Sequence, residues 1–254
     1  MTDELERLRE QRNPERYESG QSLTAYIERE RARLEKMAND PTAAAREAEA
    51  KRRQEAAAQQ ALADQQRERL MKWRSSGFPE RSIQVITAAK HRLTWPQPDV
   101  PATAWKALRQ GQCVVLLGDA GPGKTTMATE LALRLILHTG RTAQYFKAAD
   151  LVADFRHQCY SAGRKEGDWM GAMARVHLLV IDEWDKRSAT DQTADMVLLR
   201  LLDKRYDAMA PTMLISNLKP DQWDEGLHRS LRDRLRQWGQ LLICAWPSFR
   251  GAKS

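Results

Sequence analysis

The sequence has only three cysteines among its 254 residues, and their placement excludes two kinds of site. Cys113, Cys159 and Cys244 lie far apart and form no CxxC pair, so neither a disulfide framework nor a zinc ribbon is supported. The five histidines show no metal-ligand spacing. Long apolar runs are also missing, because CVVLLG and HLLVI fall far short of the roughly 20 residues of a membrane span.

A secretory signal is missing as well, since the N-terminus MTDELERLRE is charged from its third residue. We therefore expect a reduced, cytoplasmic, soluble protein with no membrane partner. Hydrophobic residues make up 42% and charged residues 30%, which is typical of a globular chain. Residues 1–80 carry 16 basic and 16 acidic side chains, so the net charge of +7 belongs to residues 81–254. This surplus permits a nucleic-acid partner without requiring one.

The composition changes near residue 75, and the part before it is rich in Ala, Glu, Arg and Gln, which favour helices. We predict helices over residues 23–38, opened by Ser22, and over residues 42–73, with Pro41 at the edge of the second. The second offers mostly alanine as apolar content, which indicates a solvated or partner-dependent helix. The first carries a helical stripe that requires a surface to cover, either within the chain or on a partner: Leu23, Tyr26, Ile27, Leu34 and Met37.

From Ser76 onward, short apolar runs alternate with helical patterns. The runs predict strands over residues 112–117, 142–148, 176–183, 211–217 and 241–246. Helices are predicted over residues 125–138, 148–160 and 193–210. Five apolar strands spaced by helices predict an α/β domain with a mostly parallel, doubly wound sheet. We thus expect a helical region at residues 1–75 and an α/β domain at residues 76–254.

The segment GDAGPGKTT fits the phosphate-binding pattern G-x-x-x-x-G-K-[ST] at every fixed position. Its glycines let the backbone N–H groups point at phosphate oxygens, and the following helix directs its positive end at the same anion. Lys124 can reach the β- and γ-phosphates, and the Thr125 hydroxyl can hold Mg²⁺. The residues expected to bind the nucleotide are Gly118, Asp119, Ala120, Gly121, Pro122, Gly123, Lys124, Thr125 and Thr126.

Polar residues follow two of the predicted strands. Asp182 and Glu183 end the run HLLVIDE, on the side of a parallel sheet where ligands bind. Asp182 would coordinate Mg²⁺, directly or through water, and Glu183 would polarise the attacking water as a general base. Asn217, after LIS, could hold that water or the γ-phosphate. Because NLKPD and DEWD do not fit the guanine-reading and switch patterns of GTPases, ATP is favoured over GTP.

Several arginines gather near the end of the chain: Arg229, Arg232, Arg234, Arg236 and Arg250. Within a nucleotide-binding domain, such a set suits an arginine finger donated to the ATP of a neighbouring subunit. A solvated basic helix face that binds nucleic-acid phosphate is the alternative reading.

These motifs resemble those of one family. FPER (78–81), GDAGPGKTT, LLVIDE, LISN, RDRLR and WPSFR occur in the order found in the DnaC/IstB-like AAA+ ATPases, in particular the bacterial replicative helicase loaders of the DnaC type. The resemblance covers roughly residues 76–252, with a looser likeness at residues 19–34. It implies an AAA+ P-loop NTPase fold preceded by an extended helical region. It also implies ATP, Mg²⁺, single-stranded DNA, and an N-terminal element that binds the replicative hexameric helicase.

The resemblance also implies roles for single residues. Lys124 and Thr125 would be the Walker A residues, and Asp182 and Glu183 the Walker B pair. Asn217 would be sensor 1, Arg234 the arginine finger, with Arg229 and Arg232 as alternatives, and Arg250 a sensor-2-like arginine. A finger that acts on a neighbour implies a homo-oligomer in the helicase complex.

Contacts to single-stranded DNA in such loaders come from the segments that correspond here to residues 154–165 and 186–192. Aromatic rings beside cations suit base stacking with phosphate contact. The candidates are Arg156, Tyr160, Arg164 and Lys165, whereas Phe155 could equally belong to the core, which we favour. For the helicase contact, Leu23, Tyr26 and Ile27 form an i, i+3, i+4 set suited to a groove on a partner.

Two other functions share these features. One is a transposition helper ATPase that serves a transposase on double-stranded DNA. The other is a non-enzymatic adaptor, in which the nucleotide only stabilises a helicase-binding fold.

Overall fold

The computed structural model describes residues 23–38, 41–91, 93–186, 192–225 and 227–249. The chain divides into two compact units, Met1–Ala63 and Asp64–Ser254. No helix within the described ranges combines the length and the apolarity that crossing a membrane requires.

The first unit contains the helix α2 (Leu23–Ala38) and most of α3 (Pro41–Arg74), as the sequence predicts. The side chains of residues 45–62 are exposed, as expected for a helix whose apolar content is mostly alanine. Ion pairs between successive turns, such as Glu49–Arg53 in α3, add modest support along the surface. Tyr26 and Ile27 on α2 are 59% and 56% exposed.

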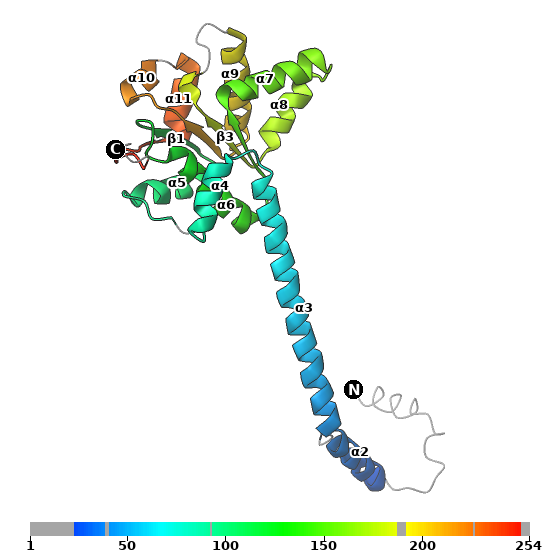
Figure 1. The fold of residues 1–254 in the computed structure, drawn as a ribbon. Coiled ribbons are helices and arrows are strands. Elements are labelled where there is room, and N and C mark those ends of the chain that lie inside the picture. The colour runs from blue at the N-terminus through cyan, green and yellow to red at the C-terminus, as the bar shows by residue number, and fades with distance from the viewer. Residues whose placement is uncertain (1–22, 39–40, 92, 187–191, 226, 250–254) are drawn as a thin grey trace, which may run out of the picture. The chain divides into compact units, whose positions relative to one another are not determined.

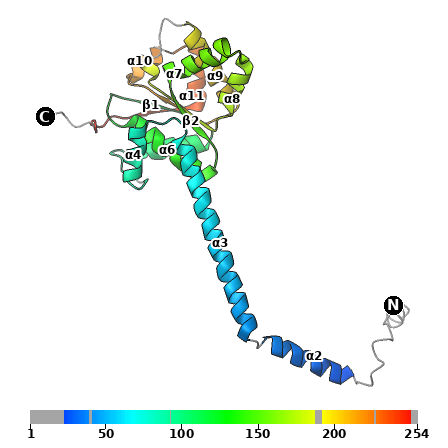
Figure 2. The same ribbon diagram turned by 45° about the vertical axis from the view of Figure 1, so that its right-hand side comes forward.

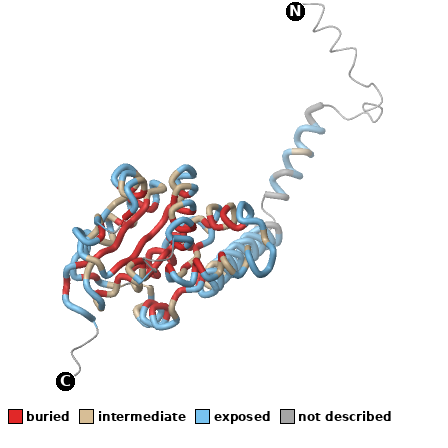
Figure 3. The backbone as a smooth tube through the Cα atoms, turned by 90° about the horizontal axis from the view of Figure 1, so that it is seen from above, coloured by how far each residue is buried: buried red, intermediate tan, exposed pale blue. Residues whose placement is uncertain are grey.

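The second unit is built on a sheet of five parallel strands in the order β2-β3-β4-β1-β5 (Figure 1). The strands are β1 (Cys113–Leu117), β2 (Ala143–Lys147), β3 (Leu178–Asp182), β4 (Thr212–Ile215) and β5 (Gly239–Ile243). The strands β1 to β4 lie within runs that the sequence predicts as strands, whereas β5 overlaps the predicted run 241–246 only at residues 241–243. The five-stranded parallel α/β architecture is therefore confirmed, with β5 shifted toward the N-terminus. Figure 3 shows buried backbone along the centre of this sheet, and every residue of β1, β3 and β4 is buried.

Helices cover both faces of the sheet, as Figures 1 and 2 show. One face packs against α4 (Glu80–Ala88), α5 (Asp99–Arg109) and α6 (Lys124–Thr139). The other packs against α7 (Ala148–Arg156), α8 (Glu166–Arg175), α9 (Gln192–Asp207), α10 (Pro220–Glu225) and α11 (Arg229–Trp238). A π-helical turn, η2 (His157–Ser161), extends α7, and a short 3₁₀ turn, η3 (Trp184–Lys186), follows β3. The sequence analysis predicted no helix at the positions of α4, α5, α8, α10 and α11.

The last turns of α3 belong to the second unit. Trp73 is fully buried, and its indole N–H donates to the carbonyl of Thr129 in α6 (3.2 Å). Just beyond α3, the Ser76 carbonyl accepts a hydrogen bond from the Tyr145 N–H on the edge strand β2 (2.8 Å). The chain thus crosses from α3 to the sheet edge through buried contacts.

Candidate active site

The P-loop joins the carboxyl end of β1 to the start of α6 at Lys124. Three of its glycines have conformations that side chains rarely adopt, with φ of +134° at Gly118, +111° at Gly121 and +85° at Gly123. A Cβ on Gly121 would lie 2.0 Å from the Ser248 Oγ, so that position also requires glycine for space. The loop and the helix N-terminus therefore have the geometry that phosphate binding requires.

Lys124 is 5% exposed, and its ammonium group donates three hydrogen bonds. Two go to the Gly118 and Asp119 carbonyls of the loop itself, at 2.7 Å each, and the third goes to Asn217 Oδ1 at 3.0 Å. Burial lowers the pKa of Lys124, opposed by nearby carboxylates such as Asp182. The structure thus brings together Lys124 and Asn217, which lie 93 positions apart in the sequence.

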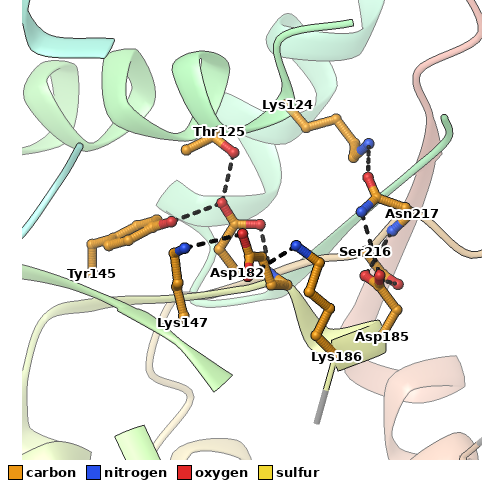
Figure 4. A network of polar contacts seen from close by, with 10 residues as sticks. Lys124, Thr125, Tyr145, Lys147, Asp182, Asp185, Lys186, Ser216 and Asn217 are labelled. Carbon is orange, nitrogen blue, oxygen red and sulfur yellow. Dashed lines mark hydrogen bonds and ion pairs between the residues drawn. The ribbon is translucent and has the colours of Figure 1, made fainter. Parts of the chain in front are cut away.

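Asp182, the last residue of β3, is buried and receives hydrogen bonds at both oxygens. Its Oδ2 accepts from the Thr125 hydroxyl (2.6 Å) and from the Tyr145 phenol (2.9 Å), and its Oδ1 accepts from the Glu183 N–H (2.6 Å). Burial and the carboxylate raise the pKa of Tyr145 far above its usual range, so the phenol stays a donor. Figure 4 shows Thr125 and Tyr145 reaching the carboxylate from different elements.

Glu183 follows directly and has an unusual backbone, with φ of +52°. This left-handed conformation costs energy for a residue with a side chain and is typical of functional turns. Each carboxylate oxygen pairs with a lysine, Oε1 with Lys147 (3.2 Å) and Oε2 with Lys186 (3.3 Å). Lys147 ends β2, where the sheet register places it beside Asp182.

A third acid, Asp185, binds the two polar residues that follow β4, Ser216 and Asn217. It accepts hydrogen bonds from the Ser216 hydroxyl (3.0 Å), the Asn217 N–H (2.9 Å) and the Asn217 side-chain amide (3.3 Å). Burial alone would raise the pKa of Asp185, but these hydrogen bonds together lower it below its ordinary value. Asn217 is therefore fixed between Asp185 and Lys124 (Figure 4).

A cavity of about 620 Å³, within the size range of small-ligand sites, is lined by Lys124, Thr125, Asp182, Glu183 and Asn217. Asp185 contacts Asn217 but does not line the cavity. Its polar part contains the P-loop, both acids and Asn217, and its apolar part contains Val85, Leu93, Trp95 and Phe249. Phe249 is held at the loop because its N–H donates to the Gly121 carbonyl (3.0 Å), and its ring meets Trp95 edge-on. The cavity thus offers anion-binding groups beside an aromatic wall.

The arginines of α11 lie in different surroundings. Arg234 pairs with Asp203 of its own chain and stacks over the Tyr206 ring, 5.7 Å from its centroid. Arg232 and Arg236 both pair with Asp224, at 3.9 and 3.2 Å. Arg229, at the start of the helix, is exposed and makes no hydrogen bond or ion pair with the part of the chain that the structure describes. Arg250 lies outside the described residues.

The candidate DNA-binding residues lie at the far end of α7 and beyond it. Tyr160 is 61% exposed on the π-helical turn, and Lys165 is exposed at the start of α8. Arg156 and Arg164 are partly exposed nearby, and Arg164 donates to the Asp168 carbonyl (3.4 Å). Phe155 is buried against Trp169, as the core interpretation predicts. Residues 187–191 of the second candidate segment lie outside the described residues, and so does the side chain of Leu23.

Sequence reasoning missed the residues that support the acids. Tyr145, Lys147 and Asp185 contact Asp182, Glu183 and Asn217, but no local motif marks them. Their roles depend on which strands are neighbours. For example, the register of β2 and β3 places the backbone of Lys147 opposite that of Asp182. Only its place as the third acid of DEWD could have drawn attention to Asp185.

A P-loop after the internal strand β1, an acid pair after β3 and a polar residue after the central strand β4 meet at the carboxyl ends of the strands. On this parallel order of strands, they define an AAA+ P-loop ATPase. The model of the family described as IstB-like ATP binding protein matches residues 54–238, well over half of the sequence. The chain belongs to this family of ATP-binding proteins, which confirms the predicted resemblance.

Solved structures share this fold at low sequence identity. AMPPCP-bound DnaA from Aquifex aeolicus has a TM-score of 0.51 and 18% identity, covering 60% of this chain and 48% of that chain. Domain III of the DnaA replication initiation protein from Thermotoga maritima has a TM-score of 0.51 and 15% identity, covering 61% and 65%. A DnaC helicase loader has a TM-score of 0.49 and 16% identity, covering 56% and 86%. The chain spans less than two thirds of either DnaA chain, and a comparison with curated proteins gives no match.

Proposed function

We propose that this ATPase is a helicase loader, which binds the replicative hexameric helicase and single-stranded DNA and delivers the helicase onto DNA. The observation that carries the proposal is the exposed pair Tyr26 and Ile27 on α2. The pair lies on a helix outside the unit that holds the ATP site, so the ATPase does not need it for its core. In the sequence, Tyr26 and Ile27 form an i, i+3, i+4 set with Leu23, a spacing that suits a hydrophobic groove on a partner.

In this proposal each site residue has one task. Lys124 binds the β- and γ-phosphates of ATP, exchanging its present bonds to the loop carbonyls for bonds to phosphate oxygens. Glu183 accepts a proton from the attacking water, and Asn217 orients that water or the γ-phosphate. Because both oxygens of Glu183 are paired with lysines, one of these pairs has to open before the carboxylate can act.

The site also suits Mg²⁺. The Thr125 hydroxyl and the Asp182 carboxylate lie 2.6 Å apart beside the P-loop, and both are the hard oxygen ligands that Mg²⁺ prefers. These two residues would hold the ion together with phosphate oxygens. When bound, the ion would neutralise charge that develops on the phosphates.

Single-stranded DNA would bind at Tyr160 and the cations around it. An exposed ring offers a stacking platform, while Arg156, Arg164 and Lys165 offer phosphate contacts. A finger from α11 would complete the ATP site of a neighbouring subunit, so the active form would be an oligomer within the helicase complex.

The test is a pull-down of a bacterial replicative helicase by the full-length chain. The double variant Tyr26→Ala with Ile27→Ala should lose helicase association while its ATP affinity and melting temperature stay those of the wild type. The matched control is Leu62→Ala, which changes another exposed apolar residue of the same unit. This variant should bind helicase normally. Unchanged helicase binding by the folded double variant would contradict the assigned grip, and no binding by the wild type would contradict loading.

The family match favours a second candidate function, a helper ATPase that acts with a transposase on double-stranded DNA. ATPase assays with single- and double-stranded DNA separate the two. A loader should be stimulated by single strands, and Tyr160→Ala should remove that stimulation. Stimulation by double strands alone would favour the transposition helper.

A further inference from the structure

The side chain of Tyr145 reaches the ATP site from the edge strand of the sheet. The strand register pairs Tyr145 with Val180, two residues before Asp182, and the phenol extends to the Asp182 carboxylate. The hydroxyl donates to Oδ2 at 2.9 Å, the same oxygen that accepts from Thr125 at 2.6 Å. Two hydroxyls from two elements thus hold one carboxylate oxygen (Figure 4).

The ring and the backbone of Tyr145 are themselves held in place by neighbouring residues. Tyr145 is 8% exposed, its ring packs on Phe78 with centroids 5.3 Å apart, and its N–H donates to the Ser76 carbonyl. A phenol held at its backbone, its ring and its hydroxyl has one orientation available. Its hydroxyl can therefore fix the orientation of the Asp182 carboxylate. Side chains held by packing position functional groups in this way.

We propose that Tyr145 is a positioning residue for the metal-binding pair, whose hydroxyl keeps Asp182 Oδ2 beside the Thr125 hydroxyl. The proposal rests on the function proposed above, in which Thr125 and Asp182 hold Mg²⁺. Without the phenol, the carboxylate can rotate away from Thr125, and the pair has to be ordered again each time Mg²⁺ binds. Tyr145 does not touch the nucleotide in this role, so its effect should appear in the metal dependence.

The variant Tyr145→Phe removes only the hydroxyl and keeps the ring and the backbone hydrogen bond. The measurement is binding of a fluorescent ATP analogue at increasing Mg²⁺, together with binding in EDTA and the melting temperature. We expect the half-saturating Mg²⁺ concentration to rise about five- to tenfold, the order of one lost hydrogen bond to a carboxylate. Affinity in EDTA should stay unchanged.

Two further variants control for a purely structural effect. Tyr206→Phe also removes a phenol hydroxyl, one that bonds Gln237 outside the cavity, and should leave the Mg²⁺ titration unchanged. In the background of Asp182→Ala, adding Tyr145→Phe should cause no further shift, because the group that it positions is gone.

The outcomes separate this proposal from the one on which it rests. If binding of the ATP analogue to the wild type did not depend on Mg²⁺, Thr125 and Asp182 would not hold the ion. This proposal would then be wrong as well. If the wild type depended on Mg²⁺ and Tyr145→Phe titrated identically, only the positioning role would fall. A shift that persisted in Asp182→Ala, or a matching loss of affinity in EDTA, would overturn it in favour of a structural role.

Discussion

Lys124 and Glu183 lie in the same cavity but carry different steps of the proposed reaction. Lys124 contacts the loop that is proposed to bind phosphate, whereas Glu183 follows β3 and each of its carboxylate oxygens is paired with a lysine. A change at the first should therefore affect binding, and a change at the second should affect turnover.

We predict that Lys124→Ala abolishes ATP binding, because its ammonium group is the buried cation of the P-loop. Glu183→Gln should bind ATP normally while turnover falls by at least about 100-fold, the typical contribution of a general base. Nucleotide binding by fluorescence and phosphate release measure the two effects. A Glu183→Gln protein with wild-type turnover would exclude this residue as the base, and turnover absent from the wild type would favour the adaptor.

Arg205 is the most buried cation of the described chain that lies outside the site, and it has no carboxylate partner among the described residues. Burial lowers its pKa to about 10, and its guanidinium donates to Thr212 Oγ1 and to four carbonyls, those of Met173, Ala174, Val176 and Pro211. It thereby joins α9, the end of α8 and the start of β4, so its role is structural.

Arg205→Met should lower the free energy of unfolding by about 2–4 kcal/mol, because it leaves buried carbonyls without donors. The matched control is Arg200→Met on the same helix, where the arginine is exposed and, among the described residues, pairs with Glu166 alone. That change should stay within about 0.5 kcal/mol. Urea unfolding measures both, and equal effects would show that the carbonyl contacts contribute little.

At the scale of elements, α11 presents four arginines with unequal freedom. The bonds of Arg234 to Asp203 and Tyr206 hold it within its own subunit, whereas Arg229 has no described partner. The resemblance implies Arg234 as the finger, with Arg229 and Arg232 as alternatives. In the proposed oligomer, we expect the exposed Arg229 to be the finger.

We predict that Arg229→Ala lowers turnover by about 10³-fold, in line with other arginine fingers, without lowering ATP affinity or stability. Mixing it with Lys124→Ala subunits should restore part of the activity, because each variant lacks a different half of a shared site. Arg234→Ala is the comparison, and should mainly lower the melting temperature. If mixtures of Arg234→Ala with Lys124→Ala regained activity, and Arg229→Ala was active alone, Arg234 would be the finger instead.

The elements differ in how well the sequence predicts them. The five strands and α6 could be predicted, because buried parallel strands are continuous apolar runs and the P-loop marks the start of its helix. The helix α8, EGDWMGAMAR, is short and contains two glycines, which disfavour a helix. Tyr145 and Asp185 could not be assigned, since their contacts depend on which strands become neighbours. That order is a tertiary property with no local signal.

At the scale of the whole molecule, the start of the ATPase unit is testable. The change in composition places it at residue 76, whereas the compact unit begins at Asp64 and includes the last turns of α3. Leu70 packs against the core there, Trp73 is fully buried in it, and Arg69 donates to the Leu137 carbonyl of α6. The two boundaries therefore differ by a set of core contacts rather than by surface residues.

A chain that begins at residue 64 should keep the ATP affinity and melting temperature of the full-length protein, and lose helicase binding. A chain that begins at residue 76 lacks Trp73, and loss of a buried tryptophan costs about 3–5 kcal/mol. Its melting temperature should fall by about 10 °C. Trp73→Ala in the full-length chain is the matched control and should reproduce most of this loss. If the two truncated chains had the same melting temperature, the end of α3 would be dispensable to the ATPase core. The boundary at residue 76 would then be correct.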